Sequence, residues 1–470
     1  MRGLMALALA LLITGCTVGP DYIRPAIDVP QAFGNAKRDA QQTANIAWWE
    51  QFRDPALDAL IAEALTGNRD IGIAAANIEQ AAAVFSQSRS AFFPQIGYGG
   101  NVSRDRASET DSPLLFSVIP NPQTSHQALA SASWEIDLWG RIRRLTESAR
   151  ADLLATEAAG QGVLLSLVSS VASGYIQLLA LDEQHRVAQR TLAAYAESLR
   201  IFELRFKYGQ VSRMTVAQAT SQYEAAAAAV PQLESQIEQA ENALSILLGR
   251  NPGPIRRGKN IHELTAPPVP AGLPSELLAS RPDIRQAEQR LIAANANIGA
   301  ARALYFPAIS LTGAYGFASS ELSDLFKGTS RTWSFAGSLT GPIFRGGAIA
   351  SGVRQAEAGR KAALLSYEKA IQSAFADVEN ALIAQSKLEE QFQAEKRLVE
   401  ANSEYVRLAR LQYEGGYVPY STVLQAEQQL FPSELNYIQT RATLLTSLVS
   451  VYKAMGGGWQ AVSTPLAARE

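Results

Sequence analysis

The sequence predicts a mainly α-helical chain with a smaller β part, built from two repeats. Two long tracts rich in alanine and leucine, 123–230 and 343–418, contain no proline, and such composition favours helix. Shorter segments between them alternate apolar and polar residues, which is the pattern of β-strands. The phrase "FFPQIGYGG" around Pro94 returns as "YFPAISLTG" around Pro307, 213 residues later. The same distance separates "NRDI" from "RPDI", so the chain is a duplicated half rather than an array of short repeats.

Each proline-free tract predicts one very long helix. In the first, apolar residues recur at spacings of four and three, close to a coiled-coil seam. A helix over 141–208 would be roughly 100 Å long at ~1.5 Å per residue, and 347–414 predicts a second rod of the same length. The apolar stripe consists of Leu164, Val168, Val171, Tyr175 and Leu178.

Both rods end in related sequences, "FKYGQVSRMTVAQA" and "YEGGYVPYSTVLQA", which align without gaps. The alignment pairs Gly209 with Gly416, and glycine at this point is a helix stop signal. Helical patterns resume over 212–249 and 420–455, so each half predicts a helix–turn–helix hairpin. A proline inside each return helix should interrupt and kink it.

Four segments between the helices have the two-residue period that marks strands. Each has room for about ten residues, the length of a tilted transmembrane strand, and aromatic residues near the ends suit an interfacial girdle. A soluble sheet with its apolar face on a core would show the same alternation. The apolar sets are Ile96, Tyr98 and Val102; Trp134, Ile136 and Leu138; Ile309, Leu311, Tyr315 and Phe317; and Trp333, Phe335 and Leu339.

The number of strands bears on the oligomeric state. Four strands cannot close a barrel, and lipid does not tolerate an open sheet edge. No apolar run of about 18 residues follows the N-terminal segment, so a membrane crossing must use strands. Three chains of four strands would supply 12, with the helical rods continuing as a tube made from all three chains.

The N-terminus has the pattern of a secretory signal over residues 1–15, with Arg2 followed by a short apolar run. The only cysteine, Cys16, follows directly in "LITGC". This arrangement resembles a bacterial lipobox, in which the cysteine is lipidated and becomes the new N-terminus. A buried free thiol is the alternative. Thr17 stands where an aspartate commonly marks inner-membrane retention, which favours the outer membrane.

Composition gives no sign of a nucleic-acid partner or a metal site. The formal net charge is −2 and charged residues make up 18% of the chain, without the basic excess of nucleic-acid binders. The histidines lack cysteine or clustered partners, so we expect no metal and no histidine base. They are His126, His185 and His262, and we expect them in loops or at the surface.

Two motifs could suggest an enzyme, and each has a plainer interpretation. "GPIRRGKN" approximates a P-loop, but Asn260 stands where Ser or Thr would hold magnesium. Glu135 and Asp137 could form a catalytic pair, although lumen-facing charge on the polar side of a strand is the simpler expectation. We therefore predict no catalytic residues.

Four phrases stand in a specific order along the chain. They are "CTVGPDYIRP" (16–25), "WWEQFRDPALDALIAEALTGNRDI" (48–71), "RPDIRQAEQRLIAANANIGAARALYFPAISLTGAYG" (281–316) and "GPIFRGG" (341–347). In this order and spacing they resemble the lipoprotein branch of the outer-membrane efflux factors, the TolC/OprM-like proteins.

The resemblance implies a long α-helical barrel continuous with a 12-stranded β-barrel, formed by a homotrimer with four strands per chain. Such a protein is the exit duct of a tripartite efflux or secretion system, including multidrug export, in the outer membrane of a Gram-negative bacterium. The implied partners are a periplasmic adaptor (membrane fusion) protein, an inner-membrane transporter of the RND type and outer-membrane lipid. No cofactor is implied beyond a palmitate-type lipid on Cys16.

The resemblance also places a closed periplasmic aperture at the tips of the two hairpins. In the family, acidic residues often line it at the position after "VL", which is Gln425 here and Gln218 in the first repeat. These neutral residues predict an uncharged constriction. The candidate aperture residues are Gln218, Thr215, Gln425, Thr422, Tyr420 and Arg213; the candidate adaptor contacts are Gly209, Gly416, Arg205 and Lys207; and the helix–strand joints are Pro94 and Pro307.

A non-conducting, lipid-anchored coiled-coil adaptor or scaffold is the competing function, and an envelope hydrolase is a distant third. Efflux adaptors usually interrupt their hairpin with soluble β segments, whereas these strands lie at one end of duplicated helices. The two predicted repeats span 57–249 and 276–455. Along the whole chain, the predicted segments are a signal peptide, 1–15; a lipidated extended segment, 16–55; first-repeat helices, 56–93 and 139–249; a first β-hairpin, 94–138; a connector, 250–275; second-repeat helices, 276–305 and 345–455; a second β-hairpin, 306–344; and a C-terminal tail, 456–470.

Overall fold

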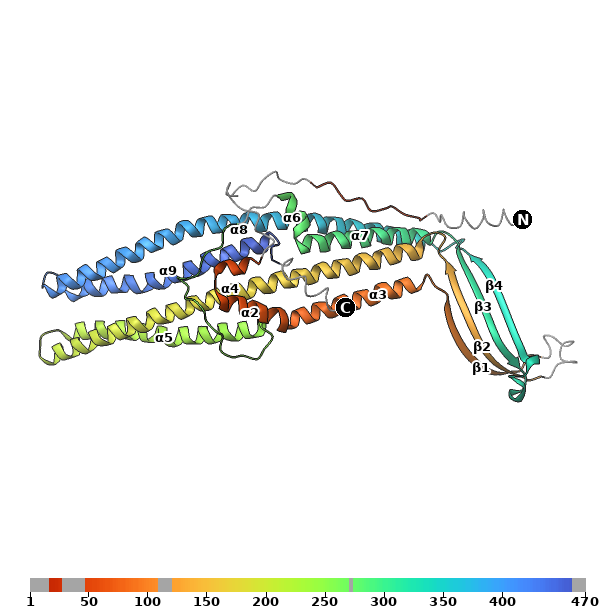
Figure 1. Cartoon of the computed structure of the whole chain (residues 1–470), viewed down its shortest axis with the longest axis horizontal. Helices are drawn as coiled ribbons and strands as arrows, with labels where there is room; N and C mark the ends of the chain where they lie inside the picture. Colours follow the sequence, from red (N-terminus) through yellow and green to blue (C-terminus); the bar gives the residue numbers. More distant parts are fainter. Residues whose placement is uncertain (1–16, 28–46, 109–120, 270–273, 459–470) are drawn as a thin grey trace. The chain divides into compact units, whose positions relative to one another are not determined.

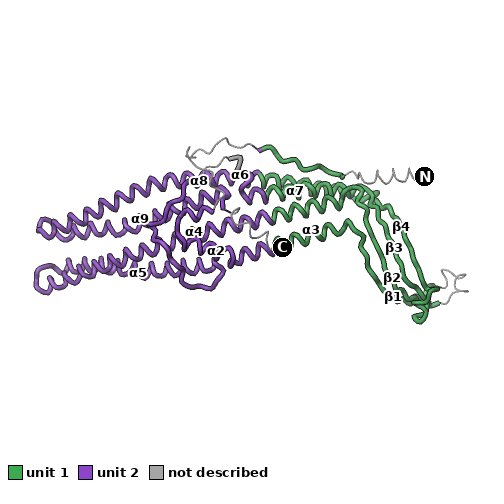
Figure 2. The backbone as a smooth tube through the Cα atoms, in the orientation of Figure 1, with its two compact units in different colours: residues 1–26, 77–156, 287–367 green, residues 27–76, 157–286, 368–470 purple. Residues whose placement is uncertain are grey.

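The computed structural model describes residues 17–27, 47–108, 121–269 and 274–458, except for the side chains of 274–276. The chain folds into two compact units, each assembled from separate stretches of sequence (Figure 2). Unit 1 consists of residues 1–26, 77–156 and 287–367, and unit 2 of residues 27–76, 157–286 and 368–470.

Helices make up most of the described chain (Figure 1). In chain order they are η1 (Trp48–Phe52), α2 (Pro55–Gly67), α3 (Arg69–Ser90), α4 (Arg141–Lys207), α5 (Arg213–Leu247), α6 (Pro274–Ser280), α7 (Pro282–Ala303), η2 (Leu322–Asp324), η3 (Gly328–Ser330), α8 (Ala348–Glu414) and α9 (Tyr420–Ala454). The 67 residues of α4 and of α8 confirm the two long rods. The return helices α5 and α9 run through Pro231 and Pro432, so neither proline interrupts its helix.

Unit 1 contains a four-stranded antiparallel sheet in the order β1-β2-β3-β4. The strands are β1 (Gln95–Asp105), β2 (Gln123–Ile136), β3 (Ala308–Ser319) and β4 (Arg331–Thr340). The register pairs Ile96 with Ala132, which pairs with Gly313. This register places the predicted apolar residues on one face, where Tyr98 is 96% and Phe335 81% exposed. Leu138 is the exception, because β2 ends before it.

Each predicted proline joint lies between a helix and a strand. Pro94 separates α3 from β1, and Pro307 separates α7 from β3. Proline cannot continue a helix, and the carbonyl groups freed there find tryptophan donors. The indole nitrogen of Trp134 donates to the backbone oxygen of Phe92 (2.9 Å), and that of Trp139 donates to Pro307 (2.8 Å). The joints are therefore fixed by these hydrogen bonds as well as by the proline ring.

The N-terminal region is less uniform than predicted. Residues 17–27 have no helix or strand, but the segment expected to be extended through residue 55 also contains η1. Its aromatic side chains explain the difference, because Trp48, Trp49 and Phe52 are all buried. A 3-10 turn places Trp49 and Phe52, which are three residues apart, on the same side. The predicted signal peptide and Cys16 lie outside the described residues.

Asp54 is the polar centre of the unit 2 core. Its buried carboxylate accepts a hydrogen bond from the backbone of Ala56 (2.9 Å), which starts α2, and another from the hydroxyl of Tyr175 (2.8 Å). It also accepts from the backbone nitrogen of Lys259 (3.1 Å). Lys259 belongs to the segment that approximates a P-loop, so a donor that such a loop would offer to phosphate is used within the chain. The segment is structural.

One stretch of α4 is long and apolar enough to cross a membrane. The expectation that no such run follows the N-terminal segment was therefore wrong. About two-thirds of that stretch (67%) is buried inside the protein, where its apolar side chains pack with the fully buried Tyr175 and Tyr452. The helix is apolar because it forms the core of unit 2.

Candidate functional site

Two hairpin tips form the candidate site. α4 and α5 are joined by a turn containing Gly209 (φ 72°), and α8 and α9 by a turn containing Gly416 (φ 75°). These left-handed conformations are the reason for the glycines. In the first tip, Ser212 caps α5 by accepting a hydrogen bond from the backbone of Thr215. Both predicted helix stops are confirmed.

An aromatic cluster joins the two hairpins a short distance above their turns. The ring of Phe202 on α4 lies 4.0 Å from that of Tyr420 on α9 and 6.5 Å from that of Tyr413 on α8. Arg205 donates to the Tyr413 hydroxyl (2.9 Å) and lies over the Phe202 ring. Burial raises the pKa of Tyr420 above its ordinary value. Tyr420 and Arg205, predicted for the aperture and for the adaptor, thus contact each other's hairpins within one chain.

A buried acidic residue lies next to this cluster. Glu427, 4% exposed, accepts two hydrogen bonds from Arg410 (3.1 and 2.6 Å) through one carboxylate oxygen. Its other oxygen has no partner in the described residues. The two residues line a cavity of about 360 Å³ between α4, α8 and α9. Nearby, Arg190 of α4 pairs with Glu434 of α9 (2.7 Å), so an ion pair and aromatic rings both join the two hairpins.

The remaining predicted tip residues do not meet within one chain. Gln425 and Arg213 are exposed, whereas Gln218 and Thr422 are half-buried. Within the described residues, none of these four side chains forms a hydrogen bond or ion pair. Lys207 is exposed at the end of α4. Whether they surround an aperture depends on neighbouring copies and stays a prediction.

Sequence reasoning missed Glu427 and Arg410. The expectation of a neutral tip used only the position after "VL", and the acidic residue lies two positions further on. Arg410 lies six residues before Gly416 and Glu427 eleven residues after it, so counting residues outward from the turn does not pair them. Their contact follows from how α8 and α9 pack, and no sequence signal indicated it.

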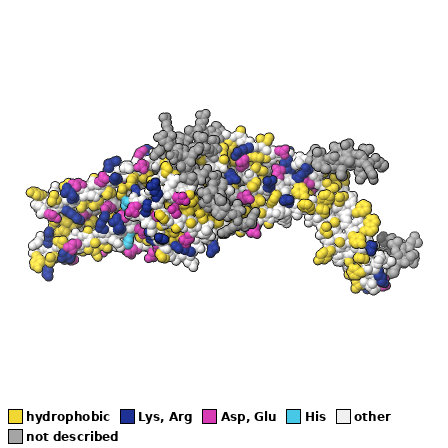
Figure 3. Space-filling model, in the orientation of Figure 1, with side chains coloured by type: hydrophobic (Ala, Val, Ile, Leu, Met, Phe, Trp, Pro, Cys, Tyr) yellow, Lys and Arg dark blue, Asp and Glu magenta, His cyan; other side chains and the backbone are white. Residues whose placement is uncertain are grey.

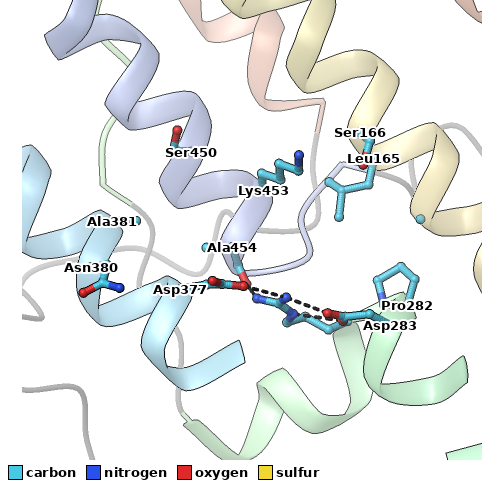
Figure 4. Close-up of a pocket in the computed structure, with 12 residues that line it drawn as sticks. Leu165, Ser166, Pro282, Asp283, Asp377, Asn380, Ala381, Ser450, Lys453 and Ala454 are labelled. Carbon is cyan, nitrogen blue, oxygen red and sulfur yellow. Dashed lines mark hydrogen bonds and ion pairs between the residues drawn. The ribbon is translucent and has the colours of Figure 1, made fainter. Parts of the chain in front are cut away.

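A second polar site lies where α9 ends and α7 begins, beside a cavity of about 500 Å³ (Figure 4). Arg281, with its side chain 10% exposed, donates to the backbone oxygen of Ala454 (2.9 Å). It also pairs with Asp283 (2.6 Å) and Asp377 (3.0 Å). Burial opposes its charge, but these hydrogen bonds raise the pKa of Arg281 above its ordinary value. The guanidinium therefore stays charged and ties together α7, α8 and α9.

Glu135 and Asp137 each bind residues at the start of α4. Glu135 binds Arg141 (2.7 Å), while Asp137, beyond the end of β2, accepts hydrogen bonds from the backbone of Ile142 (3.0 Å) and Arg143 (2.8 Å). A carboxylate that binds the first N–H groups of a helix stabilises its start. The pair belongs to the beginning of α4.

The histidines are dispersed, as expected, although two of the three are in regular structure. His126 lies in β2 and His185 in α4, where it faces Glu234 (3.3 Å); His262 is exposed in the connector. In the part of the chain that the structure describes, no group of three or more His, Cys, Asp or Glu could hold a metal ion.

Comparison with known proteins identifies the class. The sequence model of the outer membrane efflux protein family matches residues 60–250 and 273–457, close to the two predicted repeats. The chain belongs to this family. Its members are outer-membrane channels, and this chain is an outer-membrane efflux channel whose four-stranded sheet supplies one third of a 12-stranded barrel closed by three copies.

The relatives support this assignment along the whole chain. It is 36% identical over 466 residues to the probable efflux pump outer membrane protein TtgC of Pseudomonas putida, covering 97% of this chain and 96% of the relative. It is 35% identical over 468 residues to the cation efflux system protein CusC of Escherichia coli, covering 97% and 99%.

Solved structures share the fold. The outer-membrane channel OprN is 30% identical with a TM-score of 0.87, over 95% of this chain and 100% of that one. The open state of the MtrE channel of Neisseria gonorrhoeae is 34% identical with a TM-score of 0.85, over 95% and 99%. The fold predicted from the sequence is confirmed.

Proposed function

We propose that this channel is the passive exit duct of a tripartite efflux system, coupled to a periplasmic adaptor and an inner-membrane transporter of the RND type. The observation that carries the proposal is the sheet, whose two edge strands each pair on one side only and whose apolar face is exposed. Such a sheet is stable in lipid only when copies close it. A duct moves solute without bond chemistry, so the proposal assigns no catalytic residue and no cofactor.

Conduction by a trimer can be tested directly against the predicted alternative, a lipid-anchored scaffold that does not conduct. Detergent-extracted protein, cross-linked and sized by gel filtration, should run as a trimer with heat-modifiable β structure, and planar bilayers should show channel currents. A stable monomer without currents would favour the scaffold.

The proposed gate lies at the hairpin tips and has a neutral constriction formed by Gln425 and Thr422. Their replacement by alanine should widen the constriction and raise single-channel conductance. For comparison, the same change is made at the equivalent first-repeat residues, Gln218 and Thr215, and the conductance of that variant is measured separately. Unchanged conductance in both variants would place the constriction elsewhere.

The adaptor is proposed to bind at the turns. Three large apolar side chains are strongly exposed there: Tyr208 (70%), Met214 (67%) and Tyr417 (85%). Lys207 and Arg213 add positive charge beside them, and the left-handed Gly209 and Gly416 keep both turns tight. A photocrosslinker placed at Tyr417 should capture an adaptor protein in cells, whereas the same probe at the exposed Leu398, 16 residues before the end of α8, should not.

The lipid anchor on Cys16 also remains a proposal. The residues that follow it are held firmly: the backbone nitrogen of Val18 donates to Trp139 (3.1 Å), and Asp21 pairs with Arg144 (2.6 Å). A fixed segment of this kind would hold a lipid at a constant place on the protein. Replacing Cys16 by serine should abolish incorporation of labelled palmitate, and undiminished labelling would refute the assignment.

A further inference from the structure

The distal end of the sheet, away from the helices, carries two arginines on its apolar face. Arg104 follows Ile96, Tyr98 and Val102 on β1 at intervals of two, and Arg331 precedes Trp333 and Phe335 on β4 in the same way. Residues two apart on a strand share a face. Both guanidinium groups therefore lie at the margin of a surface made for acyl chains.

Both arginines are available to a ligand. Each is exposed, and neither forms an ion pair or hydrogen bond among the described residues. The charged residues at the opposite, helix-proximal end behave differently, because Arg141 and Arg143 are neutralised by Glu135 and Asp137. At the distal end, Asp324 is already paired with Lys327 (2.5 Å), and Asp105 alternates with Arg104 onto the other face of β1.

Closure of the barrel brings the two arginines to the same seam. β1 and β4 are the two edge strands of the sheet, so β1 of one copy must pair with β4 of the next. Each arginine lies near the distal end of its strand. In the strand register, Arg104 of β1 lies opposite Thr124 of β2, and Arg331 of β4 lies opposite Phe317 of β3. Every seam thus carries two such guanidinium groups at one rim of the apolar band. Figure 3 shows basic side chains, in dark blue, at this end of the sheet.

We propose that each seam binds the phosphate groups of a phosphorylated glycolipid in the outer leaflet, with Arg104 and Arg331 of neighbouring copies as the ligands. Guanidinium matches phosphate in charge and in its paired donors. Stacked aromatic rings directly below, Trp333 and Phe335 (6.0 Å between centroids), are typical of the depth where headgroup meets acyl chain. A lipid fits this site better than a free phosphate ion, because the apolar face continues from the arginines. The inference rests on the outer-membrane location and not on the proposed gate or adaptor.

Native mass spectrometry of the detergent-extracted trimer with added bisphosphorylated lipid A tests the site. The double variant Arg104→Gln with Arg331→Gln should bind it more weakly by roughly fivefold for each arginine removed. The matched control is Arg200→Gln with Arg407→Gln, which removes the same charge from exposed positions on α4 and α8 and should bind as the wild type does. The double lysine variant at 104 and 331 should retain most of the binding because it keeps the charge.

Four results would overturn the proposal. The first two are equal binding of lipid A by the glutamine variant and the wild type, and an equal loss of binding in the control variant. The third is an equal loss of binding when dephosphorylated lipid A is used, which would reflect acyl chains alone. The fourth is displacement of the lipid by inorganic phosphate, which would show an ion site. If the double glutamine variant does not trimerise, the two single variants replace it. Bilayer currents measured on the same samples separate failure of this site from failure of the duct.

Discussion

The two repeats have helices of equal length but bury them differently. α4 and α8 both contain 67 residues, and α5 and α9 both contain 35. Yet 16 residues of α9 are buried and only five of α5. Where α9 has Leu445 and Leu448, the equivalent positions of α5 are Glu238 and Glu241. Duplication thus preserved the lengths, while one return helix became core and the other remained largely exposed in the chain.

In each repeat, the end of the return helix contacts the residue that precedes an earlier helix of the same repeat, α3 or α7. The side chain that makes this contact differs between the repeats. In the first repeat, Asn68 donates to the backbone oxygen of Leu247 (2.9 Å) and accepts from the backbone of Asp70 (2.8 Å), capping α3. In the second repeat, Arg281 stands at the equivalent position and binds the equivalent backbone oxygen, of Ala454 (2.9 Å). One contact is kept by two different side chains.

The burial difference predicts the largest effect. Leu445→Ala removes a side chain that is 2% exposed and should lower the free energy of unfolding by about 3 kcal/mol, because it leaves a cavity. Glu238→Ala, at the matching exposed position of α5, should change it by less than about 0.5 kcal/mol. Urea unfolding followed by helical circular dichroism measures both, and equal losses would mean that α5 is buried to the same degree.

The two joints predict the next effect. Arg281→Ala leaves Asp283 and Asp377 without a shared cation and should cost about 2 kcal/mol, less than a fully buried pair because both aspartates are about half exposed. Asn68→Ala removes a helix cap and should cost about 1 kcal/mol. The same unfolding assay ranks the two variants by their loss of unfolding free energy. Arg281→Lys keeps a positive charge but loses the paired donors of the guanidinium, so its stability should fall between those of the wild type and the alanine variant. A larger loss for Asn68→Ala than for Arg281→Ala would reverse the comparison.

The hairpin tips predict a smaller asymmetry. Glu427→Ala should cost about 1 kcal/mol, because it breaks the contact with Arg410, whose half-exposed guanidinium can return to water. Thr220 occupies the equivalent position on α5, so Thr220→Ala is the control and should be nearly neutral. Limited proteolysis at the second turn should rise in the first variant only. Matching cleavage of both would show that the ion pair does not stabilise the tip.

The smallest predicted effect is a pH dependence in the connector. Partial burial of its side chain, which is 39% exposed, lowers the pKa of His262 below its ordinary value, against the opposing attraction of Glu183, and Arg441 and Arg186 add to the lowering. The folded protein therefore binds fewer protons than the unfolded chain, so stability present at neutral pH is lost as pH falls through the ordinary histidine range. His262→Gln should lose less stability than wild type between about pH 7 and pH 5.5. The same decline in both proteins would exclude His262 as the cause.

Much of the fold was readable because its signals are local. The long proline-free tracts predicted both helical rods, and the glycines after them predicted both turns. Strict alternation of apolar and polar residues predicted all four strands. The joints at Pro94 and Pro307 were readable for the same reason. The 3-10 turn at Trp48 was not, because it exists only to bury aromatic rings against Tyr452, which lies in α9.

The sequence by itself determined the lengths of the two long rods, the face of each strand and the positions of the turns, since each depends on residues that are neighbours in the chain. Only the tertiary structure decided which side chains of different helices and loops meet. Tyr420 joined Phe202 in an aromatic cluster, Glu427 became a buried partner of Arg410, and Asp54 took the backbone donors of the segment that approximates a P-loop. Those contacts join separate helices and loops, and their energies depend on how helices pack, which no local pattern records.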